Sequence, residues 1–184
     1  MKLNLSIKEI SLIGMCAALM VIFSQLSIPL PFTAVPITLQ IFGLVIISVI
    51  IGAKLGTLSI IVFDVLGAIG LPVFANFNGG LHVIIGPTGG YIIGFIIIAF
   101  LIGYASEKQN KILLFIASYM GLIFQLLLGT LQLKIVTGMN MQSALIAGFY
   151  PFVIKDLIMV TIAIVIGLRV KKGVKGILTR NAIA

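Results

Sequence analysis

Few side chains in this 184-residue sequence could do chemistry, and the most prominent are the adjacent Lys155 and Asp156 inside an apolar stretch. Ionisable residues within a membrane-spanning helix are costly and usually face a cavity or a partner. Adjacent helical residues point about 100° apart, so we expect these two side chains not to pair directly, and at least one to face a pocket or another helix. Asp64 is a second acid in an apolar stretch, where it would need a cation, a proton or a proton path.

The residues that most enzymes and metal sites require are nearly absent. His82 is the only histidine and Cys16 the only cysteine, so neither a histidine-pair metal site nor a disulfide framework can be built. No G-x-x-x-x-G-K-[ST] phosphate-binding loop is present, so an ATPase would have to be another subunit. We therefore expect no enzyme, no metal and no cofactor.

The Gly-rich segment 71–91 collects polar and aromatic side chains between two apolar runs. Its donors and acceptors are Asn76, Asn78, His82, Thr88 and Tyr91, and its apolar walls are Phe74 and Phe77. This mixture is typical of a small-molecule pocket. The alternative is a surface loop whose polar groups face water.

The elements that would position these residues are membrane-spanning helices. The sequence is 61% hydrophobic and 9% charged, with a mean hydropathy of +1.32, whereas soluble domains carry about a quarter charged residues. The apolar runs do not alternate as barrel strands would. They predict one all-α membrane domain, residues 1–184, with six helices near 10–28, 38–53, 57–71, 89–106, 112–136 and 151–170.

Basic residues predict the orientation of this bundle. Ten of the twelve lysines and arginines fall on one side of the predicted membrane: Lys2, Lys8, Lys54, Lys108, Lys111, Arg169, Lys171, Lys172, Lys175 and Arg180. The connections 29–37, 72–88 and 137–150 contain no charged residue. By the positive-inside rule, both termini are cytoplasmic and the polar segment 71–91 faces outward, in a multi-pass cell-membrane protein.

Three runs of sequence resemble a known family. They are Val35-Pro-Ile-Thr-Leu-Gln40, Gly67-Ala-Ile-Gly-Leu-Pro-Val-Phe74, and Asn78-Gly-Gly-Leu followed by Gly86-Pro-Thr-Gly-Gly-Tyr-Ile-Ile-Gly-Phe95. They closely resemble the BioY family, the biotin-binding S components of energy-coupling factor (ECF) transporters. The resemblance implies a six-helix subunit that captures biotin at its outer face and works with a transmembrane coupling subunit and two cytoplasmic ATPases.

The resemblance also implies a binding site made of the third connection and the last helix. Asp156 matches the family's acid, but Met159 stands where a lysine is expected, and Asn78 stands where relatives can carry arginine. Lys155 is then the nearest cation for a carboxylate. The predicted substrate-binding residues are Gln40, Phe74, Asn76, Asn78, Gly79, His82, Tyr91, Lys155 and Asp156.

Small residues at helical spacing predict close helix contacts. Gly14 and Ala18 match the spacing of the small-x-x-x-small motif by which these S components meet the coupling subunit, whereas Gly86, Gly90 and Gly94 predict packing within the chain. Two other functions stay open: an S component for a different vitamin such as lipoate, and a standalone proton-coupled carrier built around Asp64.

Overall fold

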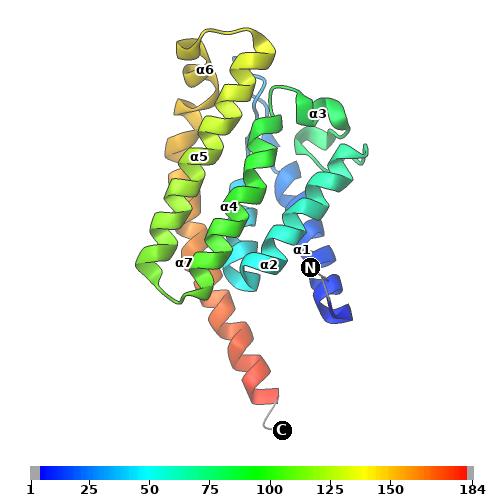
Figure 1. The fold of residues 1–184 in the computed structure, drawn as a ribbon, viewed down its shortest axis with the longest axis vertical. Helices are drawn as coiled ribbons and strands as arrows, with labels where there is room; N and C mark the ends of the chain where they lie inside the picture. Colours follow the sequence, from blue (N-terminus) through cyan, green and yellow to red (C-terminus); the bar gives the residue numbers. More distant parts are fainter. Residues whose placement is uncertain (1–4, 182–184) are drawn as a thin grey trace.

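Five stretches of the described chain, residues 5–181 of this computed structural model, are helices long and apolar enough to cross a membrane. They are α1 (Ile7–Gln25), α2 (Gln40–Ala68), α4 (Gly89–Glu107), α5 (Lys111–Thr137), and α6 (Met141–Gly148) with most of α7 (Tyr150–Asn181). Figure 1 shows them side by side in one bundle. The chain is therefore a multi-pass membrane protein.

Helix α2 contains a sharp reversal that divides it into two spans. Gly52 has φ +81°, a conformation that favours glycine. A Cβ on Gly56 would lie 3.2 Å from Cα of Ser48, although residues eight apart in a straight helix are separated by about 12 Å. The amide of Ala53 beside the reversal donates to Oε1 of Glu107, 2.8 Å away. The six-helix prediction, with a break near 53–57, is confirmed.

The centre of the bundle is α4, which lies between α2 and α5 (Figure 1). Glycines allow α4 and α5 to approach closely: a Cβ on Gly90 would lie 2.6 Å from the carbonyl of Leu128, and one on Gly94 would lie 2.7 Å from the side chain of Gln125. The predicted internal packing of this ladder is confirmed for these two glycines. Gly86 belongs to the turn before the helix.

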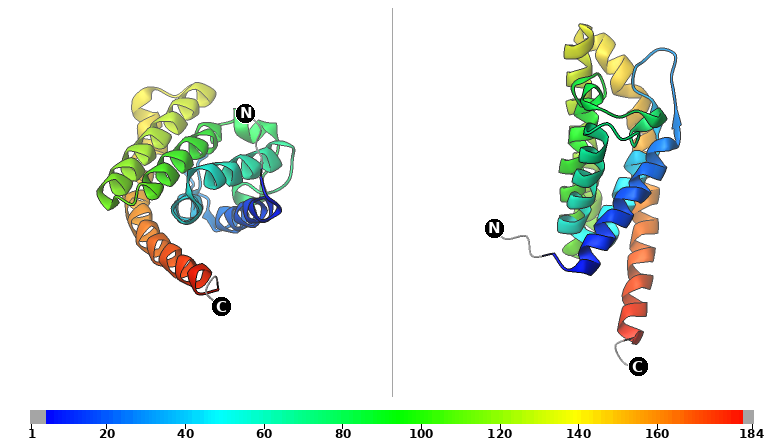
Figure 2. Two further views of the ribbon diagram at one scale, coloured as in Figure 1. Left: turned by 60° about the horizontal axis from the view of Figure 1, so that its bottom comes forward. Right: turned by 90° about the vertical axis from the view of Figure 1, so that its right-hand side faces the viewer.

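The two ends of the bundle differ in structure. At one end, called here the loop-rich end, lie β1 (Ser27–Ile28), β2 (Ile37–Thr38), the short helices η1 (Ala75–Phe77) and α3 (Leu81–Ile85), and α6. The strands pair antiparallel, Ser27 with Thr38 and Ile28 with Ile37. The connection between them is a long loop at this end of the bundle (Figure 2). The first helix consequently ends at Gln25, before the predicted boundary at residue 28.

The other end, called here the lysine-rich end, holds the start of α1, the reversal at Gly52, the α4–α5 turn and the end of α7 (Figure 1). Its basic residues with described side chains are Lys8, Lys54, Lys108, Lys111, Arg169, Lys171 and Lys172. Lys2 and the side chains of Lys175 and Arg180 lie outside the described part of the chain. The beginning of α1 and the end of α7 are therefore at the same end of the bundle.

Candidate ligand-binding site

A cavity of about 270 Å³ opens at the loop-rich end. This size is close to the lower end of small-molecule sites, about 300 Å³. Its walls come from the β1–β2 connection, the start of α2, the segment 74–92, the middle of α5 and the start of α7. Eight of the nine predicted substrate-binding residues line it: Gln40, Phe74, Asn76, Asn78, His82, Tyr91, Lys155 and Asp156.

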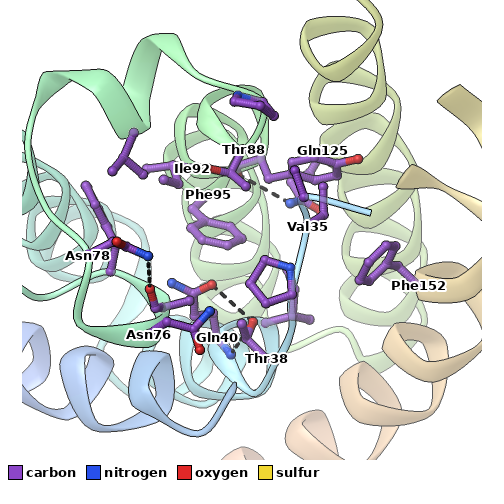
Figure 3. Close-up of a pocket in the computed structure, with 18 of the residues that line it drawn as sticks. Val35, Thr38, Gln40, Asn76, Asn78, Thr88, Ile92, Phe95, Gln125 and Phe152 are labelled. Carbon is purple, nitrogen blue, oxygen red and sulfur yellow. Dashed lines mark hydrogen bonds between the residues drawn. The ribbon is translucent and has the colours of Figure 1, made fainter. Parts of the chain in front are cut away.

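Gln40, the first residue of α2, is fixed by a short chain of hydrogen bonds. Its Nε2 donates to Oγ of Ser24 on α1, 2.9 Å away, and its Oε1 accepts from Oγ1 of Thr38, 3.1 Å away. The Thr38 hydroxyl also accepts from the Gln40 amide, which serves the unpaired N–H at a helix start. Figure 3 shows Thr38 and Gln40 close to Asn76 on one wall of the cavity. The side chains of this wall are therefore held in position by the protein itself, without a ligand.

Gln25, which the sequence did not single out, holds the segment 72–77 in place. Its Nε2 lies within 3.1–3.4 Å of the carbonyls of Pro72, Val73 and Phe74. Its Oε1 accepts from the amide of Phe77, 2.9 Å away. One side chain at the end of α1 thus satisfies main-chain groups of a loop that has little regular structure of its own.

The two asparagines of this loop differ in how they are held. Oδ1 of Asn76 accepts from Oγ of Ser27 in β1 at 2.8 Å, so the loop is also tied to the strand pair. Asn78 donates from Nδ2 to the carbonyl of Ala75 at 2.9 Å. Both side chains are exposed at the cavity. Each therefore keeps hydrogen-bonding capacity for a ligand.

Close packing explains why glycine stands at positions 67 and 79. The ring of Phe74 occupies the space where Gly67 would carry a Cβ, and it meets Phe63 edge to face at a centroid distance of 5.5 Å. Gly79 lies against the carbonyl of Leu71 with no room for a side chain. Gly79, alone among the predicted set, is not among the cavity-lining residues. Because it has no side chain, Gly79 lets the end of the 72–79 loop pack against Leu71 at its beginning.

Lys155 and Asp156 form an ion pair, so the prediction that they would not pair is wrong. Nζ of Lys155 lies 2.6 Å from Oδ1 of Asp156. The prediction used the directions of the Cα–Cβ bonds, but the flexible four-carbon stem of lysine lets its ammonium reach round the helix. Nζ also donates to the carbonyl of Thr38 at 2.9 Å. The pair joins α7 to β2 and faces the cavity, as expected for at least one of its members.

Tyr91 contributes its ring to the cavity and its hydroxyl to the bundle. The hydroxyl donates to the carbonyl of Gly148 at 2.8 Å and lies 3.3 Å from Oγ1 of Thr130. The ring packs directly on Gly129, where a Cβ would clash. Tyr91 therefore fixes the α4 wall of the cavity against α5 and α6.

Three further residues that line the cavity, Phe95, Gln125 and Phe152, were not predicted from the sequence. Phe95, Gln125 and Phe152 lie deep in apolar helices, where they read as ordinary core (Figure 3). Gln125 is 2% exposed, its Nε2 donates to the carbonyl of Tyr91, and its Oε1 has no partner among the described residues. A polar side chain in an apolar run was the available signal for Gln125.

Other predicted residues lie elsewhere. Phe77, expected as an apolar wall, is 72% exposed and does not line the cavity. Asp64 is buried in the second half of α2, and neither carboxylate oxygen has a partner among the described residues. Gly14 and Ala18 are exposed on α1, with nothing within 4 Å of a Cβ on Gly14. The described residues include no group of three or more potential metal ligands.

Comparison with known proteins agrees with this architecture. The BioY family model matches residues 1–176. The biotin transporter BioY of Thermotoga maritima is 43% identical over 162 residues, covering 86% of this chain and 93% of its own. The probable biotin transporter BioY of Pyrococcus horikoshii is 40% identical over 164 residues, covering 89% and 96%.

A solved structure extends the comparison to the fold. The crystal structure of the S-component for biotin from an ECF-type ABC transporter superposes with a TM-score of 0.82 at 32% identity, covering 94% of this chain and 95% of its own. The sequence resemblance described above is therefore confirmed over nearly the whole chain. This protein belongs to the BioY family.

Proposed function

We propose that this chain is the substrate-binding S component of an ECF transporter and that its cavity binds biotin. The observation that carries the proposal is the cavity itself: one space at the loop-rich end gathers polar groups of the segment 74–91 and the Lys155–Asp156 pair, in a member of the BioY family. We further propose that this end faces outward across the cell membrane and that the lysine-rich end is cytoplasmic.

The Lys155–Asp156 pair complements the ureido ring of biotin. A carboxylate accepts hydrogen bonds and an ammonium donates them, whereas a ureido group offers two N–H donors and one carbonyl acceptor. We assign the N–H groups to Asp156 and the carbonyl to Lys155. The ammonium of Lys155 has three N–H donors, and two of them already contact Asp156 and Thr38. The third is left for the ureido carbonyl, so we assign the carboxylate of the ligand to the polar side chains of the loop, Asn76, Asn78 and His82.

The lining contains one lysine and one aspartate, which are paired with each other, and one histidine. The part of the cavity beside this pair therefore suits a neutral fused-ring head group better than a charged one, because burying an unpaired charge costs free energy. Lipoate bound in the same way would place its dithiolane ring against this ion pair. The sulfur atoms of that ring have no N–H to donate and accept hydrogen bonds only weakly. The polar pair thus favours biotin over lipoate.

The ligand can be identified directly. Native mass spectrometry of the purified protein should show a biotin adduct, and calorimetry should show tighter binding of biotin than of lipoate. A lipoate adduct, or equal affinities, would reject biotin as the substrate.

We propose that the exposed small-residue face of α1, Gly14 and Ala18, is the surface that meets the coupling subunit. Nothing in the described bundle packs on Gly14, and small residues let helix backbones approach closely. Replacing both with leucine should weaken co-purification with a coupling subunit while biotin affinity is unchanged. Unchanged co-purification would reject this surface.

Asp64 favours one other function, a proton-coupled carrier, because its buried carboxylate has no partner among the described residues. The two functions differ in energy source. An S component reconstituted alone in liposomes should not accumulate biotin with ATP or with an imposed pH gradient. Accumulation driven by the pH gradient, and lost in Asp64→Asn, would favour the carrier.

A further inference from the structure

A second cavity, of about 210 Å³, opens at the lysine-rich end between the α4–α5 turn and α7. Three lysines line it: Lys111 from the first residue of α5, and Lys171 and Lys172 from α7. No aspartate or glutamate is among its lining residues. The cavity is separate from the candidate biotin site and from the exposed small-residue face of α1.

The lysines are arranged in two ways. Lys171 is held in place by Ser106 at the end of α4, since its Nζ donates to Oγ at 2.7 Å and to the carbonyl at 3.3 Å. Lys111 and Lys172 are exposed and form no ion pair with another described residue. The cavity therefore has one ammonium that is held in place, that of Lys171, and two exposed ones, those of Lys111 and Lys172, whose flexible side chains can bind an anion.

The backbone adds to this positive potential. The cavity includes Asn110, the N-cap of the 27-residue helix α5, whose Oδ1 accepts from the amide of Leu113 at 3.1 Å. The amides of a helix start carry partial positive charge and favour anions. Glu107, the last residue of α4, does not line this cavity. It lines a neighbouring hollow together with Lys171, and its Oε1 accepts from the amide of Ala53.

The remaining lining identifies the kind of anion. Ala105, Leu114 and Leu168 form an apolar floor beneath the lysines. Leu114 and Leu168 belong to α5 and α7, helices that are long and apolar enough to cross a membrane, and both pack in the hydrophobic core. A free anion would gain nothing from it, whereas a phospholipid carries an anionic phosphate directly above apolar chains. Basic pockets between membrane helices on the cytoplasmic side bind lipid head groups in this way.

We propose that this cavity binds the phosphate of an anionic phospholipid, with Lys111, Lys171 and Lys172 around the phosphate and Leu114 and Leu168 against the first carbons of an acyl chain. The proposal is independent of biotin binding. These lysines would then bind a specific lipid in addition to setting the orientation of the bundle in the membrane.

The experiment compares two double variants of the full chain that lose the same charge at the same end. Lys111→Gln/Lys172→Gln changes the cavity, whereas Lys108→Gln/Arg169→Gln changes exposed residues that do not line it. Lys171 stays unchanged because it links α7 to Ser106. Native mass spectrometry in detergent measures retention of added phosphatidylglycerol, with phosphatidylcholine and inorganic phosphate as separate arms. Thermal unfolding without lipid checks that each variant folds.

The wild-type chain should retain phosphatidylglycerol in preference to phosphatidylcholine. The cavity variant should lose affinity on the order of thirtyfold, from about 1 kcal/mol per lysine, and the control variant should change it less than about threefold. Lys172→Gln alone, which alters one exposed side chain, should give an intermediate loss. Equal retention of the two lipids, equal losses in both double variants, or displacement of the lipid by equimolar inorganic phosphate would each overturn the proposal.

Discussion

The Lys155–Asp156 pair at the cavity and the Lys54–Glu9 pair at the lysine-rich end are both contacts between a lysine and a carboxylate, but their surroundings differ. Lys155 and Asp156 approach to 2.6 Å with side chains 21% and 5% exposed. Lys54 and Glu9 approach to 3.8 Å with side chains 51% and 33% exposed. A buried pair is costly to break because one charge stays behind, whereas an exposed pair contributes little.

Paired charges have two different roles in this small membrane protein. At the loop-rich end, the pair lies in the wall of a cavity and bonds to β2 through Thr38. At the lysine-rich end, Glu9 has another role, because its Oε2 accepts from the amide and hydroxyl of Ser6 in the capping box of α1. The Lys155–Asp156 pair therefore forms part of a cavity wall, whereas the Lys54–Glu9 pair lies beside the N-terminal cap of α1.

The largest expected effect comes from breaking the buried pair. Asp156→Asn leaves the Lys155 ammonium without its counter-charge and removes the proposed acceptor of the ureido N–H groups. We expect biotin affinity to fall by about 3 kcal/mol, or more than about a hundredfold, with a lower unfolding midpoint. Calorimetry and thermal unfolding measure the two effects.

Glu9→Gln is the matched control, since glutamine keeps a capping box and removes only the exposed charge. It should change neither affinity nor midpoint measurably. Equal effects of Asp156→Asn and Glu9→Gln would contradict the distinction between the two ends.

The second prediction separates two roles for Lys155. Lys155→Met should lower affinity by about 1.5–3 kcal/mol, the range for hydrogen bonds to charged groups. Because we assign Lys155 to the ureido carbonyl and to positioning Asp156, biotin and biotinamide should lose affinity equally. A larger loss for biotin than for its neutral amide would show instead that Lys155 binds the carboxylate.

The third prediction concerns how the loop-rich end is held. Gln25→Leu keeps the side-chain size but removes the bonds to the segment 72–77, so we expect a loss of about 1–2 kcal/mol in biotin affinity. Gln142→Leu alters an exposed glutamine on α6 at the same end and should have no effect. Faster hydrogen exchange of the amide of Phe77 in Gln25→Leu would locate the change at the segment 72–77. Unaltered exchange would show that Gln25 does not hold this segment in place.

The smallest expected effect comes from the Tyr91 hydroxyl. Tyr91→Phe keeps the ring in the cavity wall and removes one hydrogen bond to the carbonyl of Gly148. The unfolding midpoint should fall by an amount equivalent to about 1 kcal/mol, while biotin affinity stays nearly constant. A large loss of affinity with an unchanged midpoint would place the hydroxyl in contact with the ligand.

The sequence predicted the spans well because long apolar runs and glycine breaks act locally. The break between the two halves of α2 is visible as glycine and lysine near residues 52–56, and the structure explains it by the positive φ of Gly52. The strands β1 and β2 were not predicted, because each has two residues and depends on its partner. Hydropathy cannot detect such short paired segments.

The candidate site was predictable where polar residues stand out from apolar runs, as in the segment 76–91 and at Asp156. It was not predictable where a side chain acts on distant backbone. Gln25 reaches carbonyls 47–49 residues away, and nothing in its local sequence indicates these partners. The geometry of the Lys155–Asp156 pair depends on a lysine rotamer, which the helical positions alone do not determine.

Biotin binding at the Lys155–Asp156 pair is tested most simply by calorimetric titration of the purified chain with biotin, without any partner subunit. We expect saturable binding of one biotin per chain in the wild type and in Glu9→Gln, and loss of more than about a hundredfold in affinity in Asp156→Asn. Absence of saturable binding in a folded wild-type chain, or equal affinity in Asp156→Asn and Glu9→Gln, would contradict it.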